Sequence, residues 1–287
     1  MMPEFDRKAA DRTAAEWRYL ITDMICRAGS GHLGGALSLV EIMWTLYERV
    51  MNVDPANPDW PDRDRLVLSK GHAAPVLYVA LACRGFFPAG LLGTMNADGA
   101  TLPSHADART VPGIDVTTGS LGQGLSVASG MAKAARLEGR GHSVYCIVGD
   151  GECNDGQNWE AAMFAAHHRL DNLVAITDYN RLQIDGFTDD VLNLEPLVDK
   201  WRAFGWEVFE MDGHDWDDIY SAIGAAKAVQ GKPAMIIAHT VKAKGCAVVE
   251  NTPGSHNIKV PDRAAYDRFI GGLAVRDVEL PYGEESI

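Results

Sequence analysis

Short apolar runs alternate with longer amphipathic stretches along most of the chain. The runs are rich in Val, Ile and Leu and short enough to be buried strands. They lie at 65–68, 144–148, 173–177, 206–211 and 234–240. Helical spacing predicts helices at 13–28, 38–50 (with Ser38 as N-cap), 74–84, from the 117–124 loop to 137, and at 159–169, 195–204, 216–229 and 263–269. This order predicts an α/β fold with a doubly wound, mostly parallel sheet and helices on both faces.

Length and charge narrow the class of protein. The alternation runs without a linker or internal repeat through 287 residues, so we expect a single domain over residues 1–287. A net charge of −13 argues against nucleic acid as a partner, and no apolar run is long enough to span a membrane. The five cysteines are odd in number and form no CxxC, and the start lacks the apolar core of a secretory signal. We therefore expect reduced thiols and a cytoplasmic protein.

Two predicted strands end at oxygen-bearing side chains. Asp150 follows the run at 144–148 in Gly149-Asp150-Gly151, and Asn180 follows the run at 173–177. Ligands of open α/β sheets bind outside the carboxyl ends of the strands. Oxygen ligands at adjacent strand ends suit Mg²⁺, which completes its shell with water and phosphate. A lone Gly-Asp-Gly is more often a turn, and its pairing with Asn180 favours a metal site here.

Glycine-rich loops at 29–35 and 117–124 precede helices, an arrangement that suits phosphate because free N–H groups and the helix dipole favour anions. With the metal pair, they indicate a magnesium-bridged diphosphate. Histidines in polar loops are candidates for chemistry: His32, His72, His105 and His256. We interpret the other histidines, His142, His167, His168, His214 and His239, as solvated or packed side chains. Lys242 follows the last strand and is either a ligand-binding or a surface lysine.

These segments resemble a known family. GDGECNDGQNWEAAMFAAHHRLDNLVAITDYNRLQIDG resembles the thiamine diphosphate-binding signature. AGSGHLGGALSLVEI, LSKGHAAPVLYVAL, LPSHADA and TTGSLGQGLSVASGMA resemble transketolase. The resemblance covers about residues 13–270 and is to the N-terminal half of a transketolase, or to the N-terminal subunit of a split one. It implies the thiamine diphosphate-binding fold.

The resemblance also implies roles for individual residues. Asp150, Asn180 and the Leu182 carbonyl would hold Mg²⁺, or Ca²⁺ or Mn²⁺ in its place. His32 and His105 would face the donor sugar, and His72 and His256 would lie near the diphosphate and thiazolium, which makes all four catalytic candidates. The residues implied to bind thiamine diphosphate are His72, Gly119, Ser120, Leu121, Gly149, Asp150, Gly151, Glu152, Asn180, Lys242 and His256.

Three departures from the family pattern qualify these implications. Asp155 stands where the family commonly has Glu, and His256-Asn257 stands where many relatives have His-Gly. Transketolases also need a glutamate from a pyrimidine-binding domain, for which this chain has no room. We therefore expect a chain that is inactive alone and pairs with a C-terminal transketolase subunit, as an α₂β₂ heterotetramer.

Three functions are consistent with these residues. The first is the N-terminal subunit of a transketolase that transfers a two-carbon ketol unit from a ketose to an aldose. The second is another thiamine enzyme, similar to 1-deoxyxylulose-5-phosphate synthase or a 2-oxo-acid dehydrogenase component. The third is a non-catalytic binding or regulatory protein that retains the fold. The histidines favour the first. Its substrate stays open among pentose phosphates, branched sugars and sulfonated sugars.

Overall fold

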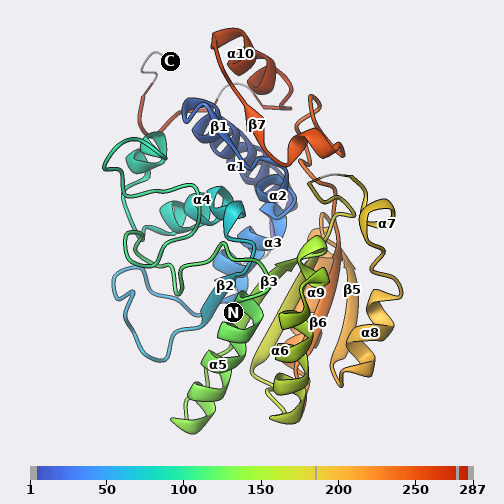
Figure 1. Cartoon of the computed structure of the whole chain (residues 1–287). Helices are drawn as coiled ribbons and strands as arrows, with labels where there is room; N and C mark the ends of the chain where they lie inside the picture. Colours follow the sequence, from blue (N-terminus) through green and yellow to red (C-terminus); the bar gives the residue numbers. More distant parts are fainter. Residues whose placement is uncertain (1–4, 185, 276–277, 284–287) are drawn as a thin grey trace.

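A parallel β-sheet forms the centre of the fold (Figure 1), in a computed structural model that describes residues 5–184, 186–275 and 278–283. Within these residues its strands stand in the order β2-β3-β4-β6-β5, and every neighbouring pair is parallel. The strands are β2 (Arg65–Leu68), β3 (Val144–Gly149), β4 (Leu173–Tyr179), β5 (Glu207–Asp212) and β6 (Ala234–His239). The predicted parallel α/β sheet is confirmed.

Helices cover both faces of the sheet. One face packs against α5 (Gly124–Leu137), α6 (Gly156–His167) and α8 (Leu197–Ala203). The other packs against α1 (Arg7–Arg27), α3 (Val40–Thr45), α4 (Ala74–Arg84) and α9 (Trp216–Lys227). In β3, Cys146 joins the first core and Ile147 the second. Because successive side chains point to opposite faces, a strand buried on both sides reads as a continuous apolar run.

Short elements connect the layers and close one end of the molecule. β1 (Ser30–Gly31) pairs antiparallel with β7 (Ile258–Lys259), which brings the first glycine-rich loop beside the tail. The remaining elements are α2 (Gly34–Leu37), η1 (Leu46–Val50), η2 (Gly71–Ala73), η3 (Ala89–Thr94), η4 (Gly151–Asn154), α7 (Thr188–Val191), η5 (Pro253–Ser255) and α10 (Arg263–Gly271). Among the described residues, none of the helices has the length and apolarity that a membrane span requires.

Several helix starts differ from the prediction. α6 begins at Gly156 and α8 at Leu197, where the prediction gave 159 and 195. The first helix begins at Arg7, where Asp6 caps it by accepting a hydrogen bond from the Ala9 N–H at 3.1 Å. The prediction of Ser38 as an N-cap is wrong, because Ser38 follows α2 and α3 begins only at Val40. The Ser38 hydroxyl donates instead to Asp178 Oδ2 at 2.7 Å, and this long-range bond takes precedence over the local capping preference.

The carboxyl ends of the parallel strands meet at one edge of the sheet. The turn after β2 carries Lys70, β3 leads into Asp150, β4 into Asn180, and β6 into Lys242. This edge therefore gathers residues that are up to 172 positions apart in the sequence, as Lys70 and Lys242 are.

Candidate active site

Asp150 lies at the end of β3 with 2% of its surface exposed. Its carboxylate accepts hydrogen bonds from the Gly151 N–H at 2.7 Å and from the Arg181 N–H. Burial, and next the Asp178 carboxylate, raise the pKa of Asp150 to about 7. A cation beside Asp150 would stabilise its ionised form, so this position fits a divalent metal ligand.

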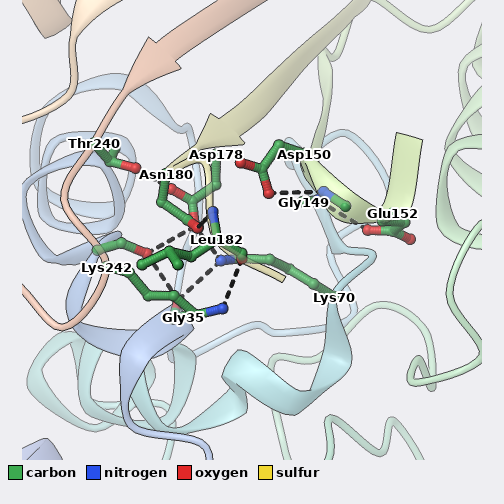
Figure 2. A network of polar contacts seen from close by, with 12 residues as sticks. Gly35, Lys70, Gly149, Asp150, Glu152, Asp178, Asn180, Leu182, Thr240 and Lys242 are labelled. Carbon is green, nitrogen blue, oxygen red and sulfur yellow. Dashed lines mark hydrogen bonds and ion pairs between the residues drawn. The ribbon is translucent and has the colours of Figure 1, made fainter. Parts of the chain in front are cut away.

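Asn180 lies beside a buried ion pair at the end of β4. Figure 2 shows Lys70 reaching from the turn after β2 to this strand end, where its ammonium pairs with Asp178. Asp178 Oδ2 also accepts from Asn180 Nδ2 at 3.0 Å. Although burial alone would raise the pKa of Asp178, Lys70 lowers it, so Asp178 is an ionised acceptor. The amide nitrogen of Asn180 must therefore face Asp178, which leaves Oδ1 free for the Leu182 N–H at 3.1 Å and for a cation.

Lys242 is buried, not a surface lysine: 3% of it is exposed. Its ammonium donates to the Leu182 carbonyl at 2.7 Å (Figure 2). The same ammonium lies 3.4 Å from His256 Nδ1. Burial, and next the charge of Lys70, lower the pKa of Lys242 to about 8. A metal bound at the Leu182 carbonyl would share that oxygen with Lys242, because a carbonyl has two lone pairs.

Glu152 connects the turn after β2, the second glycine-rich loop and the end of β3. Its Oε1 accepts from the Ser69 hydroxyl and from the Gly122 N–H at 2.8 Å, and its Oε2 accepts from the Gly149 N–H at 3.0 Å. Burial raises the pKa of Glu152 against the effect of these bonds. The carboxylate thus ties the second glycine-rich loop to the end of β3, and Glu152 acts on the site mainly by positioning backbone.

The four candidate histidines form one cluster. The ring centroid of His32 lies 5.1 Å from that of His72, 5.4 Å from that of His105 and 5.3 Å from that of His256. The rings of His72 and His256 are 5.2 Å apart. Residues separated by more than 200 positions are thus brought together by the first glycine-rich loop and its pairing with β7.

The surroundings of the four histidines stabilise the neutral form of each imidazole ring. Burial lowers the pKa of His72 to about 2, and Lys70 contributes next. Burial and Lys242 lower the pKa of His256 to about 4. The pKa values of His32 and His105 are also lowered by burial, and for His32 the charge of His105 adds to the effect. A neutral imidazole can both accept and donate a proton, as general acid–base chemistry requires.

A cavity of about 190 Å³ opens between these groups. The predicted site residues that line it are His72, Leu121, Gly149, Asp150, Gly151, Glu152, Asn180, Leu182, Lys242 and His256. His32 and His105 border it through the histidine cluster. Gly119 lies against His105 with a φ of 142°, where an added Cβ would come 3.0 Å from the His105 ring. Ser120 is exposed and outside the lining.

Four lining residues are absent from the sequence prediction: Gly35, Lys70, Gln183 and Ile184. Lys70 stands in Ser69-Lys70-Gly71-His72, and its place after a buried strand was a usable signal. Gln183 Nε2 and His32 Nδ1 are buried without a hydrogen-bond partner in the described residues. Unpaired polar atoms are costly when buried, so both fit a ligand that supplies oxygen acceptors or hydroxyl groups. The site residues therefore fit a diphosphate with a divalent cation.

A parallel sheet with such a cavity at its carboxyl edge is typical of a cofactor-dependent α/β enzyme that binds an anionic ligand with a cation. Residues 9–265 match the family model described as "Transketolase, thiamine diphosphate binding domain". The chain belongs to the transketolase family and contains its thiamine diphosphate-binding domain. The resemblance to the N-terminal part of a transketolase is confirmed.

Two proteins named as transketolase subunits and one solved transketolase support this assignment. The chain is 55% identical to the 6-deoxy-6-sulfo-D-fructose transketolase subunit of Clostridium sp. (strain MSTE9), over 85% of this chain and 89% of the relative. It is 41% identical to an apulose-4-phosphate transketolase subunit of Phocaeicola vulgatus, over 92% and 93%. The solved transketolase of Campylobacter jejuni superposes with a TM-score of 0.87 at 33% identity, over 93% of this chain and 43% of that one. The chain thus spans less than half of that longer transketolase.

Proposed function

We propose that this chain is the N-terminal subunit of a two-chain transketolase whose donor is a sulfonated ketose of the 6-deoxy-6-sulfo-D-fructose type. Residues 1–287 act as one thiamine diphosphate-binding domain, in the cytoplasm. A C-terminal subunit supplies the pyrimidine-binding domain with its activating glutamate, and the two chains form an α₂β₂ heterotetramer. The observation that carries this proposal is the convergence of Asp150, Asn180, Lys242 and the four histidines on one cavity.

The donor is inferred from similarity. The relative that shares 55% identity is named for 6-deoxy-6-sulfo-D-fructose, whereas two relatives named for apulose 4-phosphate share 41% and 45%. All three relatives are named as subunits, which supports a partner chain. In the proposed reaction the C2–C3 bond of the ketose breaks, and C1–C2 becomes bonded to the aldehyde carbon of an aldose. A sulfonated six-carbon ketose leaves a four-carbon aldose that retains the sulfonate.

The cofactor side of the cavity has defined tasks. When bound, thiamine diphosphate supplies the nucleophilic carbon that adds to the donor carbonyl. Asp150, Asn180 Oδ1 and the Leu182 carbonyl hold Mg²⁺, or Ca²⁺ or Mn²⁺ in its place. Lys242 and Gln183 donate to the diphosphate, and Gly151 leaves room beside the Gln183 side chain. The Gly119–Leu121 backbone, with Ser120 between, would contact the aminopyrimidine. Glu152, which accepts from the Gly149 N–H, fixes that loop by accepting from the Gly122 N–H.

The histidine cluster moves protons on the substrates. Breaking the C2–C3 bond turns the donor's C3 hydroxyl into an aldehyde, so that hydroxyl must lose a proton. The acceptor's carbonyl oxygen must gain one. His32 and His105 are assigned these transfers because their rings are neutral and accept and return protons near neutral pH. His72 and His256 orient the cofactor beside Lys70 and Lys242.

The proposal is tested with this chain and a candidate pyrimidine-domain subunit, purified separately and together. Ketol transfer from 6-deoxy-6-sulfo-D-fructose should require both chains, thiamine diphosphate and Mg²⁺. The donor screen includes a ketose phosphate and pyruvate. A preference for pyruvate would favour the second class of thiamine enzyme. Robust turnover by this chain alone would refute the two-subunit arrangement.

The metal site has its own test. Asp150→Asn removes the carboxylate expected to bind the cation, and chelation of Mg²⁺ should have the same effect. We expect the variant to lose at least about tenfold in Mg²⁺-dependent thiamine diphosphate affinity, measured by calorimetry. Asp190→Asn, an exposed aspartate of α7, is the matched control and should bind as the parent does. Parent-like binding by both variants would exclude Asp150 as a ligand.

A further inference from the structure

The turn that carries Lys242, residues 241–245 after β6, has an unusual backbone. Ala243 has a φ of 58° and Gly245 a φ of 84°, both in the left-handed region. Glycine adopts this region freely, but a residue with a Cβ is strained there and stays only where its surroundings hold it. Ala243 is completely buried. The conformation of the turn therefore depends on the groups that contact it.

Two side chains from distant elements hold the two ends of this turn. His214, in the connection between β5 and α9, accepts a hydrogen bond from the Val241 N–H through Nε2 at 2.9 Å. Arg18, on α1, donates from Nε to the Lys244 carbonyl at 2.8 Å. The Gly34 carbonyl accepts from the Ala243 N–H at 3.0 Å between them. Lys242 thus lies between two anchored residues.

Glu41, on α3, joins the two anchoring side chains. Arg18 Nη2 donates to both Glu41 oxygens, at 2.6 and 2.8 Å, and Glu41 Oε2 lies 3.1 Å from His214 Nδ1. The three side chains are 9–12% exposed. Because the Val241 N–H is a donor, His214 Nε2 carries no proton, so Nδ1 carries it and donates to Glu41. The network selects one tautomer and one ring orientation.

We propose that His214 is a positioning residue for the cofactor site: with Glu41 and Arg18, it fixes the 241–245 turn and so places the Lys242 ammonium beside the Leu182 carbonyl. This inference rests on the proposed role of Lys242 toward the diphosphate. His214 is not among the described residues that line the cavity, and its side-chain hydrogen bonds go to Glu41 and Val241, so its effect on cofactor binding passes through the turn.

Two substitutions test the roles of the two ring nitrogens of His214 separately. His214→Asn keeps a donor near the Nδ1 position for Glu41 but offers no acceptor to Val241. His214→Gln can place its oxygen near the Nε2 position and accept from Val241. In the complex with the partner subunit, we expect His214→Asn to weaken Mg²⁺-dependent thiamine diphosphate binding about tenfold, as loss of one buried hydrogen bond predicts. His214→Gln should stay within about threefold of the parent. The kcat at saturating cofactor should change little in either variant.

A double-mutant cycle with Lys242→Met tests whether the effect passes through Lys242. If it does, His214→Asn should add little to the affinity loss of Lys242→Met. Additive losses, or parent-like binding by His214→Asn, would overturn the inference. If Lys242→Met alone binds as the parent does, the proposed role of Lys242 fails, and this outcome is distinguishable because it involves no change at His214.

The accessibility of Lys242 can also be measured in the absence of the cofactor. Labelling of Lys242 by an amine-selective reagent, followed by mass spectrometry, should be several-fold faster in His214→Asn than in His214→Gln. Equal rates would contradict the proposal. Circular dichroism checks that each variant is folded. If His214→Asn does not fold, Arg18→Lys replaces it under the same criteria, because one ammonium cannot reproduce the guanidinium's bonds to both Glu41 and the Lys244 carbonyl.

Discussion

Replacing Lys70 by Met should expose how strongly the carboxyl edge of the sheet depends on one buried ion pair. The side chains of Lys70 and Asp178 are 3% and 0% exposed. The substitution keeps the aliphatic length but removes the ammonium that pairs with Asp178 and donates to the Gly35 carbonyl at 2.9 Å. Asp178 then keeps a buried negative charge with only neutral donors, from Ser38, Asn180 and Thr240.

The expected loss follows from these contacts. Breaking a buried pair by removing one partner typically costs about 3–5 kcal/mol. The Gly35 carbonyl loses the Lys70 donor and keeps only the Ser38 hydroxyl at 3.2 Å, which adds up to about 1 kcal/mol, and the three remaining donors to Asp178 offset a similar amount. We therefore expect Lys70→Met to lower the free energy of unfolding by about 3–5 kcal/mol, a large fraction of the roughly 5–15 kcal/mol that stabilises a typical domain.

Urea unfolding followed by circular dichroism measures this loss. The double variant Lys70→Met/Asp178→Asn removes both charges and should recover at least about 1 kcal/mol relative to Lys70→Met. Lys227→Met, at the exposed end of α9, is the control and should stay within about 0.5 kcal/mol of the parent. A loss below about 1 kcal/mol in Lys70→Met, or a double variant less stable than the single one, would refute the reasoning.

Two further predictions concern backbone contact and pH. Gly71→Ala should destabilise by about 1–3 kcal/mol in thermal unfolding, because its Cβ would meet the Thr118 carbonyl carbon at 2.5 Å. Gly130→Ala, on the exposed face of α5 with nothing within 4 Å, should stabilise by about 0.5–1 kcal/mol. The pKa of His256 is lowered to about 4 in the folded chain, against about 6.5 in the unfolded chain. Between these pH values the unfolded chain binds more protons, so the free energy of unfolding should rise with pH. Discounted for partial exposure, His256→Gln should reduce this rise by about 1 kcal/mol between about pH 5 and pH 7.5 in urea titrations, and an unchanged rise would contradict the assignment.

Most of the fold was predictable because the central strands β3, β4 and β6 are buried on both faces. A run such as 144–148 has few alternatives to a central strand, and a parallel order follows from the helices between runs. The error at Ser38 has a physical cause. A serine before an apolar stretch is a good N-cap, but Ser38 donates to Asp178, which is 140 positions away. Local preference cannot reveal a partner so distant in sequence.

Some residues of the candidate site could likewise be predicted from the sequence, and others could not. Asp150 and Asn180 were predictable because strand ends and spacing are visible in the sequence, and the four histidines were marked by their polar loops. Lys70 and His214 show the limit. The sequence places Lys70 beside His72 without revealing Asp178 as its partner, and it gives no sign that His214 contacts the turn carrying Lys242. Both roles arise only when separate elements pack together.

The charges at the carboxyl edge of the sheet explain why Lys70 and Lys242 have different roles. Asp178 takes the ammonium of Lys70 and accepts three further hydrogen bonds, so this pair is complete within the chain. Among the residues that the structure describes, Asp150 accepts hydrogen bonds from backbone donors only, and burial, followed by the Asp178 carboxylate, raises its pKa to about 7. Lys242 is bonded to a neutral carbonyl, and its pKa is lowered to about 8. One anionic and one cationic group thus remain without a charged partner in contact, which is the arrangement that a metal-bound diphosphate would neutralise on both sides.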